Sequence, residues 1–469
     1  MKRRRFMGWR ALRKRRRAFI LVTCLSMAIP TFLQAETLAE ALANAYTSSG
    51  LLEQNRALLR AADEDAATAV AALRPIIDFG AALSRNLNES RPDVTSRNAN
   101  LTATWVLWNG ARARLSAQAA RETVLATRAA LLSLEQRVLF RAVQAYMDVI
   151  RDTEFVALRE NNVQLLEQEL RAAGDRFDVG EVTRTDVALA EARLAQARSN
   201  LATSQGNLTN TQQEFLAATG QLPTDLTAPP RLPERPASVE IGQAFAIRNH
   251  PDVMQVQHQL ASAELMVQAA RAELGPSLSF QGRLDSADTD GSLTDGESAS
   301  LAISLRQRIY QGGALTSRLR STMASRDSVR AGLLVTQKNI RQDVAAAMVR
   351  VEVAEANISA SEGQVQAAEV AFRGVREEAR LGARTTLDVL DAEQELLNAQ
   401  ANLIAAQSEL NVAAYQILQS QGALTAENLG LNVQIYDPED YYEKVKNAPA
   451  LISARGRQLD RVLRKLDEE

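Results

Sequence analysis

The feature that most constrains this sequence is an internal repeat with a constant offset of 202 residues. Residues 381–400, LGARTTLDVLDAEQELLNAQ, match residues 179–198, VGEVTRTDVALAEARLAQAR, at eight of twenty positions. Two more landmarks keep this offset: WNGA at 108–111 with YQGG at 310–313, and Gly220 with Gly422. Because the landmarks spread over 112 residues without a change of spacing, the chain consists of two copies of one unit.

The repeat divides the chain into segments. Residues 36–222 and 237–424 form the two copies. The segment 223–236 between them holds five of the twelve prolines, which predicts an extended linker because proline removes backbone donors. Residues 425–469 have no internal counterpart and are expected to form a C-terminal tail.

The first 35 residues have the parts of a secretory signal peptide. They hold ten Lys or Arg and no acidic residue, and the basic block runs directly into the apolar run from Ala18 to Ile29. Cleavage is expected after Ala35. The alternative is a basic arm that binds nucleic acid, but such an arm does not account for the apolar run. The remaining chain has 44 basic against 56 acidic residues, so no nucleic-acid partner is expected.

The mature chain is expected to contain neither a transmembrane helix nor a cysteine. The apolar run of the leader is too short to span a bilayer, and no other stretch reaches 18 apolar residues. The only cysteine, Cys24, lies in the leader after LVT, which lacks the small residues expected before a lipid-modified cysteine. We therefore expect no disulfide and no thiolate metal site.

Long helices dominate each copy. Residues 110–180 contain no proline and predict a helix of roughly 105 Å at about 1.5 Å per residue. Helices of about half that length are expected from 37 to 73 and after Gly180, so two short helices match one long one. Apolar residues return every seven positions, which indicates coiled coils. They are Val187, Leu194, Leu201, Leu208 and Phe215 in the first copy, and Val389, Leu396, Leu403, Leu410 and Ile417 in the second.

Each copy also holds two segments with apolar and polar residues in alternation. These segments are 76–87, 98–108, 277–284 and 300–310. Strands of about ten residues with one apolar face are typical of a transmembrane β-barrel wall, although a half-buried soluble sheet alternates in the same way. Trp105, Trp108 and Tyr310 lie near the helix-proximal ends, where interfacial aromatic residues collect.

Four strands cannot close a barrel. An open edge in lipid leaves N–H and C=O groups without partners, at a cost of several kcal/mol each. If these strands span a membrane, several chains must share one barrel, and the protein is an obligate oligomer.

With these motifs in place, the chain resembles the TolC family of bacterial outer-membrane channels over residues 36–424. The resemblance is carried by the two strand–strand–helix copies, by WNGA and YQGG, and most specifically by LGARTTLDVLDAEQELLNA at the far turn. It implies a homotrimer that shares a twelve-stranded barrel in the outer membrane and a helical coiled-coil tunnel in the periplasm. It also implies that the tail 425–469 lies in the periplasm at the equator of the helices. It also implies an exit duct for type I protein secretion or multidrug efflux, with a periplasmic adaptor and an inner-membrane ABC or proton-driven RND-type pump as partners.

The resemblance also implies roles for charged residues at the tip. Asp388 and Asp391 would line the closed periplasmic end as rings of carboxylates, which favour cations. On a helical wheel they lie about 180° from Val389 and Leu390, which supports their facing water. The alternative is a pair of ordinary solvated carboxylates.

The gate latch implied by the resemblance pairs Arg384 with Asp186 on the neighbouring hairpin. Ala379 departs from the family pattern, because some members have at this position a tyrosine that assists the latch. Gly180, Thr183, Gly382 and Thr385 are expected at the tips that the adaptor contacts. The same four residues also fit plain helix-turn chemistry, in which Gly ends one helix and Thr caps the next.

No enzyme, cofactor or metal site is expected. His250 and His258 have no ligand cluster around them and are predicted to be ordinary polar positions. Asp63, Glu64 and Asp65 are predicted to form a solvated helix face. Two rival readings are a periplasmic adaptor, which would have one hairpin flanked by small β-domains, and a structural periplasmic coiled coil, which has no need of amphipathic strands.

Overall fold

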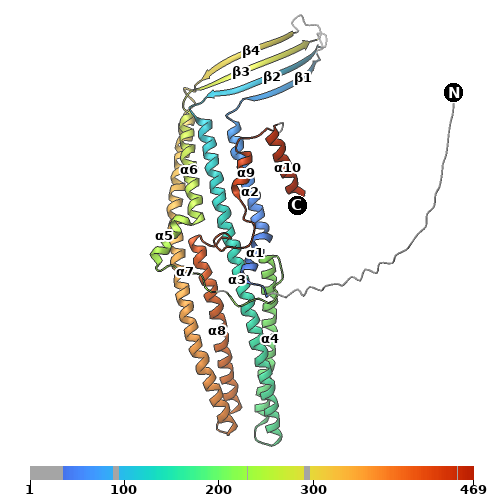
Figure 1. The fold of residues 1–469 in the computed structure, drawn as a ribbon, viewed down its shortest axis with the longest axis vertical. Helices are drawn as coiled ribbons and strands as arrows, with labels where there is room; N and C mark the ends of the chain where they lie inside the picture. Colours follow the sequence, from blue (N-terminus) through green and yellow to red (C-terminus); the bar gives the residue numbers. More distant parts are fainter. Residues whose placement is uncertain (1–34, 88–93, 230, 290–295, 451–452, 469) are drawn as a thin grey trace, which may run out of the picture. The chain divides into compact units, whose positions relative to one another are not determined.

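The computed structural model describes residues 35–87, 94–229, 231–289, 296–450 and 453–468 (Figure 1). Nearly all of the expected signal peptide, including Cys24, lies outside these residues. The two copies contain the same order of elements: two helices, two strands and two further helices. The predicted repeat is therefore confirmed in the fold.

The helices of the first copy are α1 (Leu38–Ser48), α2 (Gly50–Ala71), α3 (Arg112–Asp178) and α4 (Arg184–Thr219). Those of the second copy are α5 (Val239–Asn249), α6 (Pro251–Ala272), α7 (Ala314–Arg380) and α8 (Thr386–Gln421). The long helices α3 and α7 both have 67 residues, and α4 and α8 both have 36. This confirms the predicted match of lengths between the copies.

The first short helix of each copy is broken, which corrects the prediction of one continuous helix from 37 to 73. Ser49 is extended (φ −69°, ψ 106°) and accepts a hydrogen bond from Leu52 N at 3.4 Å, so it ends α1 and caps α2. In the second copy His250 precedes Pro251 and separates α5 from α6. Serine is a preferred cap, and a residue before proline avoids the helical conformation.

The structure differs from the prediction of ordinary polar positions at His250 but not at His258. His250 is buried, and its Nδ1 accepts a hydrogen bond from Asp252 N at 3.1 Å. Burial lowers the pKa of His250. His258 lies 2.8 Å from a carboxylate oxygen of Glu122 on α3, so it joins the second copy to the first. Both side chains have structural roles at helix contacts.

Helices α3 and α4 pack as one hairpin, and α7 and α8 pack as another (Figure 1). Leu194 and Phe215 of α4 and Val389 and Ile417 of α8, which belong to the predicted heptad stripes, are buried. Toward the sheet, α2 and α6 lie alongside α3, while α6 also contacts α7. The seven-residue spacing therefore marks the positions that hold the hairpins together.

Four antiparallel strands form one sheet in the order β1-β2-β3-β4. They are β1 (Ile76–Asn86), β2 (Val94–Trp108), β3 (Ser277–Thr289) and β4 (Gly296–Arg306). The β2–β3 pair joins the two copies, with Leu101 opposite Leu284 and Thr102 opposite Arg283. Strands β1 and β4 form the two edges, and each pairs with one neighbour in the chain.

The register places apolar residues of all four strands on one face of the sheet. Because opposed residues share a face, the pairs Phe79–Leu101, Trp105–Phe280 and Phe280–Ile303 build a continuous apolar surface. Many of these side chains are open to the surroundings: Phe79 is 73% exposed and Leu301 is 80% exposed. The other face carries Thr102, Gln281, Arg283 and Ser304, as the alternating pattern predicts.

The three predicted interfacial aromatic residues lie at the helix-proximal end of the sheet. Trp105 and Trp108 lie in the C-terminal part of β2, which leads into α3. Trp105 Nε1 donates a hydrogen bond to the Leu73 carbonyl oxygen at 3.1 Å. Tyr310 lies beyond β4, which ends at Arg306, and is 87% exposed. Strand β4 is therefore shorter at this end than the predicted segment 300–310.

The largest core cluster lies where α1, α3 and α4 meet. Tyr146 is fully buried there, with its ring 6.4 Å from that of Phe215. Its hydroxyl lies 3.0 Å from the Glu36 carbonyl oxygen and 2.9 Å from that of Thr227. Glu36 also pairs with Leu226 in a parallel bridge, so the start of the first copy and the proline-rich linker are fixed to the same point of α3.

The C-terminal tail folds back onto the first copy. Its helix α9 (Pro438–Val445) contacts α2, and α10 (Ala454–Glu468) contacts α9. Arg74 donates to the carbonyl oxygens of Asn447 at 2.6 Å and Ala448 at 3.0 Å. Arg128 of α3 pairs with Glu439 at 3.2 Å. The repeat pattern contained no signal for this docking, because the tail has no counterpart in either copy.

The prediction of a solvated face at Asp63, Glu64 and Asp65 is wrong for Asp63. Its side chain is fully buried, and neither carboxylate oxygen has a hydrogen-bond partner among the described residues. Burial raises the pKa of Asp63 to about 6, while the nearby Arg128 lowers it. Glu64 accepts a hydrogen bond from the Tyr441 hydroxyl of α9 at 2.8 Å, which shows that the tail covers this part of α2.

Among the described helices, none combines the length and the apolar character needed to cross a bilayer.

Candidate functional site: the tips of the two hairpins

The two hairpins end in turns of the same geometry. Gly180 (φ 81°) and Gly382 (φ 80°) occupy the left-handed region directly after α3 and α7. Thr183 and Thr385 then cap α4 and α8. The repeated Gly-x-x-Thr therefore has a local cause in both copies, because glycine tolerates the positive φ and threonine satisfies a free N–H.

Each capping threonine forms a reciprocal capping box with an aspartate three residues later. The Asp186 carboxylate accepts from Thr183 N at 2.9 Å and from its hydroxyl at 2.7 Å. The Asp388 carboxylate accepts from Thr385 N at 2.9 Å and from its hydroxyl at 2.8 Å. These hydrogen bonds lower the pKa of both aspartates, so both carry a negative charge at neutral pH.

Arg384 lies in the second turn and bonds within its own hairpin. Its Nε lies 2.9 Å from a carboxylate oxygen of Glu378 in the last turn of α7, and this pair raises the pKa of Arg384. Among the described residues no hydrogen bond or ion pair joins Arg384 to Asp186. Within one chain each of the two predicted latch residues thus has a local partner, and Glu378 is a residue that the sequence reading missed.

Asp391 is exposed on α8 and Asp388 is partly exposed, while Val389 and Leu390 are buried. The two carboxylates are thus more open than the apolar stripe, which agrees with the helical wheel, and their place in a constriction stays a prediction. Asp391 forms an ion pair with Arg193 of α4 at 2.7 Å. Sequence reasoning missed Arg193, because pairing between residues 198 positions apart has no local signal.

A groove of about 890 Å³ lies between the two tips. It is lined by both turns and by the ends of α3 and α7, and it brings together five of the predicted tip residues. These five are Thr183, Asp186, Gly382, Arg384 and Thr385. Gly180 does not line the groove. The wall also includes Arg176, Glu181, Arg376 and Arg380, so the groove carries charges of both signs.

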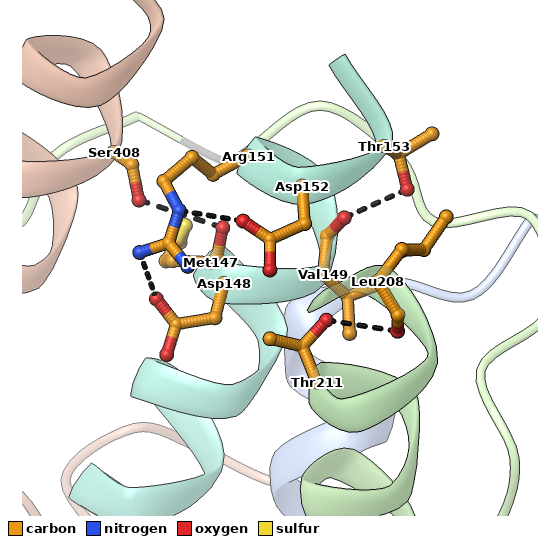
Figure 2. Close-up of polar contacts among 9 residues, drawn as sticks. All are labelled: Met147, Asp148, Val149, Arg151, Asp152, Thr153, Leu208, Thr211 and Ser408. Atoms are coloured by element: carbon orange, nitrogen blue, oxygen red, sulfur yellow. Dashed lines mark hydrogen bonds and ion pairs between the residues drawn. The ribbon is translucent and has the colours of Figure 1, made fainter. Parts of the chain in front are cut away.

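Above the tips, α8 of the second hairpin lies against α3 of the first. Figure 2 shows one point of this contact, where Ser408 of α8 donates to the Met147 carbonyl oxygen of α3 at 3.4 Å. Next to it Arg151 lies between two carboxylates of its own helix, at 2.6 Å from Asp148 and 2.8 Å from Asp152. A second point lies nearer the tips, where Asn162 of α3 donates to Glu393 of α8 at 2.6 Å.

The sequence matches the outer membrane efflux protein family over residues 40–221 and 245–423, which are the two copies. The chain belongs to this family. The outer membrane efflux protein BepC of Brucella suis is 34% identical over 415 residues, covering 88% of this chain and 91% of the relative. The outer membrane protein TolC of Escherichia coli is 22% identical over 420 residues and covers 84% of each chain.

Solved structures of outer-membrane channels have the same fold. The structure of CusC aligns with a TM-score of 0.75 at 18% identity and covers 83% of this chain and 93% of that one. The structure of VceC from Vibrio cholerae aligns with a TM-score of 0.72 at 20% identity and covers 82% and 96%. Membership of the outer membrane efflux protein family confirms the predicted location in the outer membrane and the role as an exit duct. It decides against the adaptor and the structural coiled coil.

Proposed function

We propose that three copies of this chain form one export channel, with a shared barrel in the outer membrane and a helical tunnel in the periplasm. The observation that carries the proposal is the sheet. Its apolar face suits lipid, and its two edges, β1 and β4, each have one neighbour in the chain. Backbone groups in lipid need partners, so β4 of one chain pairs with β1 of the next until the sheet closes.

The polar face of the sheet then lines the water-filled lumen, and Trp105, Trp108 and Tyr310 lie at the membrane boundary nearest the helices. The groove between the tips receives a helical hairpin tip of a periplasmic adaptor. Its charges of both signs suit a polar partner better than an apolar one. An inner-membrane pump, either an ABC transporter or a proton-driven one, supplies the energy, because the chain itself is a passive duct.

The closed state places Asp388 and Asp391 of each chain around the axis at the tips. A ring of carboxylates at a constriction attracts cations and repels anions. Arg384 and Asp186 from neighbouring hairpins hold this end shut. Arg384 is exposed and Asp186 is partly exposed, so the latch is weak enough for adaptor binding to release it.

Small toxic molecules are the cargo that we favour. The relatives TtgC and ArpC of Pseudomonas putida are named as parts of efflux pumps for toluene and for antibiotics, respectively. Type I protein secretion is the second candidate, because the only cysteine lies in the leader without the residues that precede a lipid-modified cysteine. If the function is efflux, loss of the gene lowers the minimal inhibitory concentration of antibiotics. If the function is secretion, loss of the gene removes a secreted protein from the medium.

Oxidative crosslinking tests the shared barrel. Pairs of cysteines, one on β1 and one on β4, are introduced into the mature chain, which is otherwise free of cysteine after the leader. We expect crosslinked dimers and trimers in the outer-membrane fraction. Pairs on β2 and β4 serve as the control, because β3 separates these strands in the sheet. A monomer that stays soluble without detergent would overturn the proposal.

A further inference from the structure

The contact between the two hairpins of one chain is held by three polar bridges near the tips. Arg376 of α7 pairs with Glu169 of α3 at 3.1 Å, and Arg193 of α4 pairs with Asp391 of α8 at 2.7 Å. The third bridge, from Asn162 to Glu393, differs from the other two because it is formed by a buried carboxyl group. The first hairpin is thereby joined to the helix that carries Asp388 and Asp391.

Glu393 is only 4% exposed. One of its oxygens accepts from Asn162 Nδ2 at 2.6 Å, and the other has no hydrogen-bond partner among the described residues. Leu166, Leu194, Ala197 and Leu390 form an apolar cluster at the same place between the helices. A cavity of about 20 Å³ lies beside the carboxyl group, which is large enough for a single water molecule.

The duplicated sequence supplies an internal comparison. Glu191 of α4 is the counterpart of Glu393 at the offset of 202 residues, and the two are identical in the repeat alignment. Glu191 is exposed, whereas Glu393 is buried. The glutamate at this place in the repeat is therefore not buried in both copies. Its burial in the second copy comes from the contact of α8 with α3.

We propose that Glu393 is a positioning residue of the gate, whose protonated carboxyl group holds α8 against α3 and whose ionisation loosens this contact. The inference rests on the proposed function in one respect, namely that movement of α8 changes the opening at the tips. The loosening itself is independent of that function, because it concerns the packing of two helices in one chain.

The charged groups around Glu393 come from every neighbouring helix. The charge of Glu169 on α3 disfavours ionisation of Glu393. The hydrogen bond from Asn162 on α3 and the charge of Arg376 on α7 favour ionisation of Glu393. From α4, Arg193 lines the adjoining cavity, but it is paired with Asp391. Gln196 and Asn200 of α4 and Gln394 of α8 are neutral. Burial is the largest influence, and it raises the pKa of Glu393 to about 7.

The sign of the effect follows from linkage. A carboxyl group whose pKa is higher in the packed state binds its proton more tightly there, so acid favours the packed state. The packing is strongest below the ordinary pKa of a glutamate, and the advantage is lost as pH rises through about 7. Between pH 5.5 and 8.5 the ratio of packed to loosened contact is expected to fall by on the order of tenfold or more.

Spin labels test the loosening directly. Gln164 on α3 and Asn402 on α8 are exposed and are replaced by cysteine for labelling. Labelled chains are co-assembled with an excess of unlabelled chain, and the distance distribution is measured at pH 5.5 and 8.5. We expect a longer or broader distribution at pH 8.5, and E393Q should keep the acidic distribution at both values. A distribution that does not change with pH, or that still changes in E393Q, would overturn the inference.

Single-channel recordings on the same proteins connect the contact to the gate. Conductance of the wild type is expected to rise between pH 5.5 and 8.5, and E191Q, as the matched control, is expected to behave like the wild type. E393Q is expected to hold the acidic conductance throughout. If the distances change with pH but the conductance does not, the contact of α8 with α3 depends on pH without affecting the gate. The proposed link from α8 to the gate would then be wrong.

Discussion

The guanidinium group of Arg193 lies 2.7 Å from the Asp391 carboxylate, and this pair joins α4 to α8 near the tips of the two hairpins. Arg193 belongs to the first copy and Asp391 to the second, so the bridge crosses the repeat boundary. Both side chains are more than one-third exposed. Water and salt therefore weaken the bridge, and its contribution to stability is about 0–1 kcal/mol.

The variant Arg193→Gln is expected to make the channel more selective for cations. Removing the guanidinium leaves the full charge of Asp391 at the proposed constriction, while the small loss of the exposed pair changes the melting temperature little. The measurement is the reversal potential across a planar bilayer in a KCl gradient. Arg198→Gln is the control, because Arg198 pairs with Glu167 inside the first hairpin at 2.9 Å. Equal reversal potentials for the two variants would remove Asp391 from the conduction path.

The variant Arg384→Ser is expected to increase single-channel conductance and antibiotic leakage. The substitution removes the proposed latch and the pair with Glu378 together. Arg380→Ser is a matched control in the same turn, because it removes a comparable pair with Glu377 at 2.8 Å. The variant Glu378→Gln removes only the pair with Glu378 and keeps Arg384 available for Asp186. Conductance that rises in Glu378→Gln as well would show that the pair within the turn, rather than a bond to Asp186, restrains the tip.

The variant Gly382→Ala is expected to destabilise the second turn by about 1–2 kcal/mol, because an L-residue is unfavourable at a φ of 80°. No atom lies within 4 Å of the added Cβ, so the cost is conformational. Gly374→Ala in α7 provides the opposite control, since it also meets no atom within 4 Å and favours the helix by about 0.5–1 kcal/mol. Thermal unfolding in detergent should move in opposite directions for the two variants, and shifts of the same sign would contradict the assigned turn.

The variant Asp63→Asn is expected to stabilise the protein more at pH 8 than at pH 5, because stability is lost between the ordinary pKa of an aspartate and the raised pKa of Asp63. The pKa of Asp63 is raised to about 6 in the folded state, so the wild type loses stability as pH rises through this value. The difference in melting temperature between pH 5 and pH 8 should therefore shrink in the variant. Asp65→Asn, at an exposed position two residues away, should retain the wild-type difference. A wild type that melts at the same temperature at both pH values would show that Asp63 is solvated.

The elements set by short-range pattern could be predicted from the sequence. Glycine and threonine at fixed places determine the two turns, and the heptad spacing determines which sides of α4 and α8 are buried. The break at Ser49 was missed, although a serine before a glycine is a local cap signal, because the apolar pattern continues through it. The predicted helix from 37 to 73 therefore included the break at Ser49.

The contacts between distant segments could not be predicted. Asp63 is buried because the tail docks on α2, and no periodicity relates the tail to the repeats. Arg193 and Glu393 acquire their partners from helices of the other copy. The identical positions Glu191 and Glu393 illustrate the limit: the same residue in the same local sequence is exposed in one copy and buried in the other. Only the packing of the two hairpins distinguishes them.

The equal lengths of α3 and α7, and of α4 and α8, restrict how channels of this kind evolve. A longer periplasmic reach needs additional residues in both arms of each hairpin, because otherwise the turns of the two hairpins would no longer end at the same level. Each addition must also be a multiple of seven, about 10.5 Å of helix, to keep the apolar seam in phase. Among relatives, changes in tunnel length are therefore expected in whole heptads that are added to all four hairpin arms together. The gradual changes in length that loops permit are not expected here.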